Sequence, residues 1–195
     1  MTLTKPNLTG RDGTPVLGVA GWKKSGKTTL TLRLVTELTR RGFRIATVKH
    51  AHHDLQLDSS EADSARHRRA GAAQVAVVSS ERWGLITELK GAPEPDFPDV
   101  IAMLDPCDLI IVEGYKSAPI PKIEARRTAS FTREPIAPND PLVIAVAADH
   151  STEAEGLPLF ALDDIDGLVG LIVEQFGLGQ PRPPSADPLP KTAND

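Results

Sequence analysis

The sequence predicts an α/β fold with a mainly parallel, twisted sheet and helices on both faces. Two observations support this prediction. Short, continuous apolar runs such as 16–20 and 109–112 are typical of strands that are buried on both sides. Segments with helical periodicity alternate with these runs along the chain, which is the order expected of βαβ units.

The composition excludes several classes of protein. The chain has 195 residues, of which 40% are hydrophobic and 25% charged, as is usual for one globular domain. No apolar stretch approaches the roughly 20 residues of a membrane-spanning helix, and the N-terminus lacks the apolar core of a secretory signal. The only cysteine is Cys107, which excludes a disulfide framework and favours a cytoplasmic location. A net charge of −4 argues against a general nucleic-acid-binding protein.

The first predicted βαβ unit consists of a buried strand, an amphipathic helix and a second strand. Leucines recur every four residues in the helix, and Gly42 is expected to end it. The predicted strands cover 16–20 and 45–48, and the predicted helix covers 28–41.

A second helix is expected over 60–70. Ser60 and Asp63 resemble a capping box at its start, and basic residues lie at its end, as the helix dipole favours. Further strands are predicted at 75–78, 85–87, 109–112, 123–125 and 142–147, and a last helix at 164–176. The polar segment 1–14 is expected to be a flexible leader, and the Pro-rich segment 177–195 a disordered tail.

A phosphate-binding loop is the strongest functional signal in the chain. Gly21–Thr28 matches the pattern G-x-x-x-x-G-K-[ST] and lies between a predicted strand and a predicted helix. Glycines let backbone N–H groups surround a polyphosphate, Lys27 can reach the β- and γ-phosphates, and the Thr28 hydroxyl can bind Mg²⁺. The sequence therefore predicts a P-loop NTPase-like, nucleotide-binding domain over 15–176. The expected nucleotide contacts are Gly21, Lys24, Ser25, Gly26, Lys27, Thr28 and Thr29.

Two acidic residues follow buried strands and are further candidates for this site. Glu113 ends the apolar run 109–112 in the manner of a Walker B element, so we expect it to orient the Mg²⁺ shell or the attacking water. Asp108 lies at the start of that strand, at the wrong end for the metal. Asp149 follows the run 142–148 and is predicted to accept hydrogen bonds from guanine N1 and N2. The alternative for both candidates is a structural role, as an ion pair or a cap.

The segment 49–54, Lys-His-Ala-His-His-Asp, follows the second predicted strand. In a βαβ nucleotide fold this position lies near the γ-phosphate, so Asp54 is expected to hold Mg²⁺ or its waters. The alternatives are a transition-metal site built by the imidazoles and a solvated loop. The residues expected to meet a second anion or a partner are Lys49, His50, His53 and Lys116.

Two other groups of residues admit both a functional and a structural role. The arginines either bind a second anion or form a solvated face, and the tryptophans either stack on rings or belong to the core. These residues are Arg66, Arg68, Arg69, Arg126 and Arg127, and Trp22 and Trp83.

Taken in order, these motifs resemble the MobB family, the molybdopterin-guanine dinucleotide biosynthesis adaptor proteins. The similarity covers roughly residues 15–175. Its specific segments are 21–30, 48–54, 63–64, 69–72, 82–83, 108–116, 121–124 and 143–149. The chain departs from the family pattern at Ala62, where a lysine is common, so we leave this position out of the site. It departs again at Ala148, where a serine often precedes the aspartate.

The resemblance implies a cytoplasmic, homodimeric GTP-binding protein with at most weak GTPase activity. It implies a role mainly as an adaptor, assisting the guanylyltransferase that joins GMP to molybdopterin, with molybdopterin itself as a further candidate ligand. From the motifs themselves, we expect Mg²⁺ as the cofactor and Lys27 and Glu113 as the catalytic residues. Three alternatives remain open on the residues alone. They are a metal-delivery GTPase that uses His50, His52 and His53, a small-molecule kinase, and an adaptor that only binds GTP.

Overall fold

The structure is a computed structural model that describes residues 8–51 and 58–179. Its contacts divide the chain into two compact units, one formed by 1–50 with 97–195 and the other by 51–96. The sequence predicts one domain over 15–176 and does not indicate this division. No helix within the described ranges is long and apolar enough to cross a membrane.

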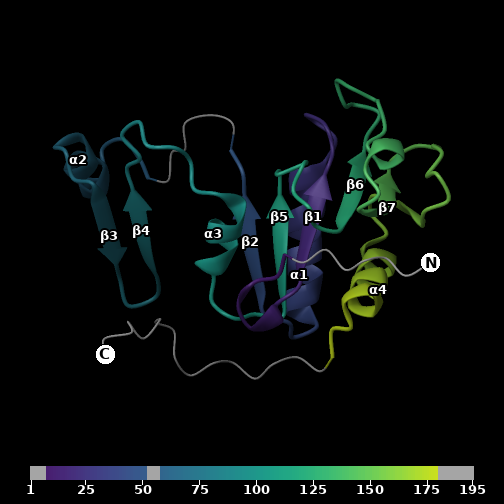
Figure 1. Cartoon of the computed structure of the whole chain (residues 1–195), viewed down its shortest axis with the longest axis horizontal. Coiled ribbons are helices and arrows are strands. Elements are labelled where there is room, and N and C mark those ends of the chain that lie inside the picture. Colours follow the sequence, from purple (N-terminus) through teal and green to yellow (C-terminus); the bar gives the residue numbers. More distant parts are fainter. Residues whose placement is uncertain (1–7, 52–57, 180–195) are drawn as a thin grey trace. The chain divides into compact units, whose positions relative to one another are not determined.

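The larger unit is built on a six-stranded sheet in which all neighbouring strands are parallel (Figure 1). The strand order is β2-β5-β1-β6-β7-β8, so the chain fills one side of the central β1 before it crosses to the other. Ligands of such sheets bind at the carboxyl ends of the strands, where the order reverses. The strands are Val16–Ala20 (β1), Ile45–Lys49 (β2), Leu109–Glu113 (β5), Lys122–Arg126 (β6), Val143–Ala148 (β7) and Leu159–Ala161 (β8).

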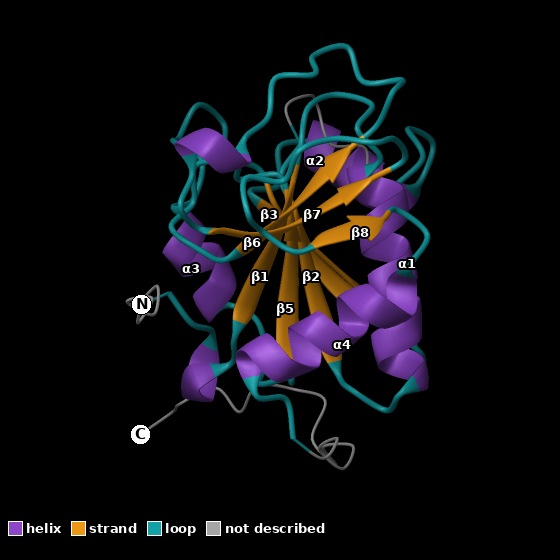
Figure 2. Ribbon diagram, turned by 90° about the vertical axis from the view of Figure 1, so that its right-hand side faces the viewer, coloured by secondary structure: helices purple, strands orange, loops and turns teal. Residues whose placement is uncertain are grey.

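Helices cover both faces of this sheet, and Figure 2 shows α3 (Phe97–Ala102) on the opposite side from α1 (Lys27–Arg40) and α4 (Ile165–Phe176). Successive strand residues point to opposite faces, which produces two separate cores. One core contains Leu17, Val19, Leu109 and Ile111 with the apolar residues of α1 and α4. The other contains Val16, Ile110 and Val112 with Ile101 of α3. The predicted α/β fold with helices on both faces is confirmed.

The smaller unit contains α2 (Asp63–Arg69) and an antiparallel hairpin of β3 (Gln74–Val78) and β4 (Trp83–Thr87). The strands predicted at 75–78 and 85–87 are present, but they form an antiparallel two-stranded sheet of their own and do not join the parallel sheet. Its apolar side chains are largely exposed.

The predicted capping box at the start of the second helix is wrong. The residue before α2 is Ala62, which has no side chain able to cap, and Ser60 lies outside the helix. Asp58 instead accepts hydrogen bonds from Ser64 and from Arg68. A carboxylate that bonds a side chain in the first turn and another in the last fixes this short helix without a cap.

The short elements of the larger unit were not predicted, and these include α3 with six residues and β8 with only three, too few to show periodicity. Part of the expected leader packs against this unit. Thr14 is 1% exposed, and its hydroxyl donates a hydrogen bond to the Cys107 carbonyl at 3.1 Å. Residues 1–7 and 180–195 lie outside the described ranges.

Candidate nucleotide-binding site

The phosphate-binding loop joins the end of β1 to the start of α1. Gly21, Lys24 and Gly26 have positive φ values of 149°, 66° and 90°. Left-handed positions of this kind occur in the concave backbone loops that bind anions. A Cβ atom at Gly21 would lie 2.6 Å from the Ala125 carbonyl oxygen, and one at Gly26 would lie 2.9 Å from Arg127 Cδ. Glycine is therefore required at both positions.

Ser25 and Lys27 are two polar side chains of the loop that could bind an anion. Ser25 is 2% exposed, and its Oγ has no hydrogen-bond partner among the described residues. Lys27 Nζ donates to the Trp22 carbonyl at 2.8 Å. Burial lowers the pKa of Lys27, Glu113 opposes this, and the charges of Lys116 and Lys49 lower the pKa further. An anionic ligand would relieve this excess of positive charge.

The end of β5 meets the start of α1 beside this loop. Thr28 Oγ1 donates a hydrogen bond of 2.5 Å to Glu113 Oε1, and Lys49 Nζ lies 3.6 Å from the same oxygen. Glu113 is 9% exposed. Asp108 lies at the other end of β5, away from this loop, and accepts a hydrogen bond from the Arg44 amide at 2.7 Å. The hydroxyl and carboxylate oxygens of Thr28 and Glu113 suit Mg²⁺, which prefers oxygen ligands.

The residues expected to meet a second anion are only partly described. Lys49 is exposed, the His50 ring stacks on Tyr115 with 4.5 Å between centroids, and Lys116 Nζ lies 3.5 Å from the centroid of the Trp22 ring. His52, His53 and Asp54 lie outside the described residues. Among the side chains that are described, no cluster of three His, Cys, Asp or Glu is arranged to hold a metal ion.

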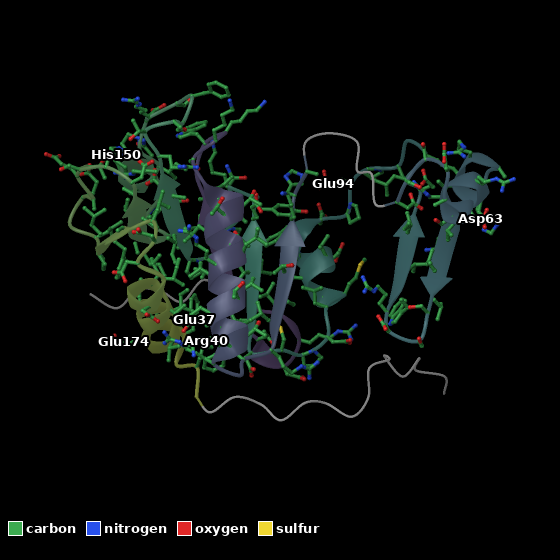
Figure 3. The ribbon with its side chains drawn as sticks, turned by 180° about the vertical axis from the view of Figure 1, so that it is seen from behind. Glu37, Arg40, Asp63, Glu94, His150 and Glu174 are labelled. Carbon is green, nitrogen blue, oxygen red and sulfur yellow. The ribbon has the colours of Figure 1, made fainter. Side chains whose placement is uncertain are left out.

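A cavity of about 620 Å³ lies beside the loop, a size typical of small-ligand sites. Thr29 and Gly26 line it from the loop side, and Phe160 and Leu162 give it an apolar wall. Asp149 and His150 lie at its edge, just after β7; Figure 3 labels His150 among the loops at the carboxyl end of the strands. The cavity therefore combines apolar surface with a carboxylate, as a site for a polar ring requires.

The two oxygens of Asp149 are in different environments. Oδ1 accepts from the Thr128 amide at 2.8 Å and its hydroxyl at 3.1 Å, and it contacts His150 Nδ1 at 2.9 Å. Oδ2 lies 3.5 Å from Arg127 Nε. The hydrogen bond with His150, followed by those with Thr128, lowers the pKa of Asp149 to about 2. The carboxylate is thus charged at neutral pH, and Oδ2, beside Arg127, has fewer partners than Oδ1 among the described residues.

The structure supports the structural role for most of the arginines. Arg126 is 8% exposed and pairs with Glu124 at 2.8 Å. Arg66 and Arg68 pair with acids, and Arg69 donates to the Ser60 carbonyl. Of these five arginines only Arg127 lines the cavity, which Arg33 of α1 also lines. The alternative in which Trp83 is a buried core residue is wrong, because its side chain on the hairpin is 50% exposed.

The segment 127–134, which the sequence does not indicate, lies against the phosphate-binding loop. Ser130 Oγ donates to the Lys23 carbonyl at 3.3 Å, and Trp22 Nε1 donates to the Glu134 carbonyl at 2.7 Å. Lys24 Nζ lies 4.5 Å from the centroid of the Phe131 ring. These contacts join parts of the chain that are more than a hundred residues apart, so no local sequence motif predicts them.

A glycine-rich loop between a central parallel strand and a helix, with an acid at the end of the neighbouring strand, defines the P-loop NTPase-like class of α/β proteins. Residues 16–149 match the family model described as Molybdopterin guanine dinucleotide synthesis protein B, MobB. The chain belongs to this family.

Individual relatives agree with this assignment. The chain is 38% identical over 169 residues to the molybdopterin-guanine dinucleotide biosynthesis adapter protein of Escherichia coli strain K12, covering 86% of this chain and 96% of that protein. It is 39% identical over 144 residues to the protein of the same name in Haemophilus influenzae, covering 72% and 78%. The crystal structure of a MobB protein homolog from Bacillus stearothermophilus superposes with a TM-score of 0.62 and 29% identity, covering 83% of this chain and 97% of that one.

Proposed function

We propose that this chain is a GTP-binding accessory protein of molybdenum cofactor biosynthesis that assists the attachment of GMP to molybdopterin. Family membership and the adapter names of its relatives support the pathway. The observation that carries nucleotide binding is the 2.5 Å contact between Thr28 of the loop and Glu113. It joins the two sequence motifs that P-loop proteins use around a triphosphate.

Different residues of the site would bind different groups of the nucleotide. Lys27, with Lys24, supplies charge to the phosphates, Ser25 and Thr29 supply hydroxyls, and the positive end of α1 faces the same anion. Thr28 and Glu113 would hold Mg²⁺, which supplies charge neutralisation on the β- and γ-phosphates when bound. We infer that Glu113 also orients a water molecule and that the chain has a weak GTPase activity secondary to the adaptor role.

A reconstituted assay tests the adaptor role. Formation of the dinucleotide from GTP and molybdopterin by a molybdopterin guanylyltransferase is measured with and without this chain. We expect the chain to raise the rate or yield, and the Lys27→Ala variant to lose the effect. An assay in which the wild-type chain binds GTP but changes nothing would remove the proposed role while leaving nucleotide binding in place.

We propose that Asp149 reads guanine through Oδ2, and Asp149→Asn tests this. An amide can keep its oxygen at the Oδ1 position, where Thr128 donates, while its NH₂ group replaces Oδ2 and opposes the donors at guanine N1 and N2. Since a charge-assisted hydrogen bond contributes about 1.5–3 kcal/mol, GTP affinity should fall about ten- to a hundredfold.

ATP is the matched control for Asp149→Asn, because adenine lacks these donors and its binding should change little. Both nucleotides are titrated into both proteins by calorimetry. Equal losses for GTP and ATP would mean that Asp149 only positions Thr128 and the segment that follows it.

We propose that the protein acts as a homodimer in the cytoplasm. The hairpin of the smaller unit supports dimerisation, because Val78, Trp83 and Leu85 lie on one face of it and are 75%, 50% and 54% exposed. A two-stranded hairpin is marginally stable alone, and a second copy would cover these side chains.

The double variant Val78→Glu/Trp83→Glu is expected to shift the protein from dimer to monomer, because it places charge in a surface that must be desolvated. Molar mass is measured by light scattering after size exclusion. Glu81→Lys, at the exposed turn between the strands, serves as the control. A wild-type protein that is monomeric at high concentration would exclude the dimer.

A further inference from the structure

Trp22 contacts two cationic side chains at once. Its carbonyl oxygen accepts a hydrogen bond from Lys27 Nζ at 2.8 Å, and its ring lies under Lys116 Nζ, 3.5 Å from the ring centroid. The indole N–H donates to the Glu134 carbonyl at 2.7 Å, which fixes the orientation of the ring. Lys116 is thereby held next to an anion-binding loop by a contact that a phosphate would outcompete, because charge-assisted bonds to phosphate are stronger than cation–π contacts at exposed sites.

The backbone turn after Glu113 places Lys116 in this position. Gly114 and Tyr115 have φ values of 100° and 41°, a left-handed pair directly after the acidic end of β5. A Cβ atom at Gly114 would lie 2.9 Å from His50 Cβ, so the turn requires glycine there. Tyr115 holds its unfavourable conformation with its ring packed against His50 and Phe97, with centroids 4.5 Å and 4.3 Å apart. The turn thus directs the chain back towards the loop.

Lys116 does not line the candidate base cavity. Together with Trp22 it lines a second hollow of about 250 Å³, whose wall includes Pro135 and Ile136. None of these residues lines the larger cavity that contains Thr29 and Asp149. A nucleotide with its base in the larger cavity and its phosphates in the loop would point its terminal phosphate towards Glu113 and Lys116.

We propose that Lys116 binds the terminal phosphate of the nucleotide, leaving the Trp22 ring when a triphosphate fills the loop, and so distinguishes a triphosphate from a diphosphate. This inference rests on the proposed function. The electrostatics agree with it, because the positive charges of Lys116 and Lys49 both act to lower the pKa of Lys27. Lys49 already contacts Glu113. Lys116 contacts the face of the Trp22 ring, so its ammonium can move from the ring to a phosphate.

Calorimetry of the Lys116→Ala variant with Mg²⁺-GTP and Mg²⁺-GDP tests the assignment. We expect GTP affinity to fall about tenfold or more, the effect of one lost charge-assisted bond, and GDP affinity to change less than about twofold. Lys90→Ala, in the smaller unit, is the matched control and should bind both nucleotides as the wild type does. If Lys116→Ala weakens both nucleotides equally or neither, the assignment is wrong although the wild type binds GTP. If the wild type binds neither, the proposed function fails as well.

Tryptophan fluorescence reports the movement itself. Trp22 and Trp83 are the two tryptophans of the chain, so Trp83→Phe leaves Trp22 as the only indole. We expect GTP to change its emission more than GDP does, since only a triphosphate draws the ammonium from the ring. This difference should vanish in Trp83→Phe/Lys116→Ala. A difference of the same size in that double variant would overturn the transfer of Lys116.

Discussion

Lys27→Ala is expected to remove measurable nucleotide binding while leaving the fold intact. In the structure the ammonium is bonded to a loop carbonyl, so its loss breaks no buried ion pair and should cost little stability. In the complex it would contact two phosphates. Loss of two charge-assisted hydrogen bonds of about 1.5–3 kcal/mol each lowers the affinity about a hundredfold or more.

Calorimetric titration with Mg²⁺-GTP measures this effect, and circular dichroism with thermal unfolding verifies the fold. Lys90→Ala is again the matched control, because it removes the same charge from the other compact unit. A folded Lys27→Ala protein that binds GTP as tightly as the wild type would contradict the assignment of the phosphate-binding loop.

Glu124→Ala is expected to cause the largest loss of stability, about 3–5 kcal/mol in the free energy of unfolding. Glu124 is 1% exposed and accepts hydrogen bonds from the Ile136 and Ala137 amides at 2.8 and 2.9 Å. It also pairs with Arg126, itself 8% exposed, at 2.8 Å. Its removal leaves a buried guanidinium without its carboxylate and two amides without an acceptor, each of which is costly in a low-dielectric interior.

Denaturant unfolding of Glu124→Ala and the wild type measures the difference. Glu174→Ala is the control, because Glu174 is an exposed glutamate on α4 (Figure 3), where the change should stay within about 0.5 kcal/mol. A loss below about 1 kcal/mol for Glu124→Ala would show that water replaces the carboxylate, and the segment that begins at Ile136 would then not depend on it.

The features predicted from the sequence are those encoded locally. The loop 21–28 carries its own glycines and lysine, and the leucines of α1 repeat within one helix, so neither depends on distant contacts. Glu113 could be placed because the carboxyl ends of parallel strands meet at one edge of the sheet, and the structure brings it to Thr28.

The features that were missed depend on residues far apart in the chain or on competition between neighbours. Ser60 and Asp63 have the spacing of a cap, but Asp58 bonds Ser64 and Arg68 instead. Glu124 has no local pattern that indicates burial, since its partners lie 12 and 13 residues away in a loop.

The contacts of segment 127–134 with the phosphate-binding loop likewise need the sheet to form first, because β6 carries this segment to the side of β1. The same holds for the contact of Lys116 with Trp22, which links two loops that follow neighbouring strands.

Titration of Mg²⁺-GTP and Mg²⁺-ATP into the wild-type protein is the most direct test of the central claim, that this loop and the adjoining cavity hold a guanine nucleotide. We expect saturable binding of one GTP per chain and an affinity for ATP at least about tenfold weaker, since adenine cannot donate to Asp149. A folded protein that shows no saturable binding of GTP would contradict the claim.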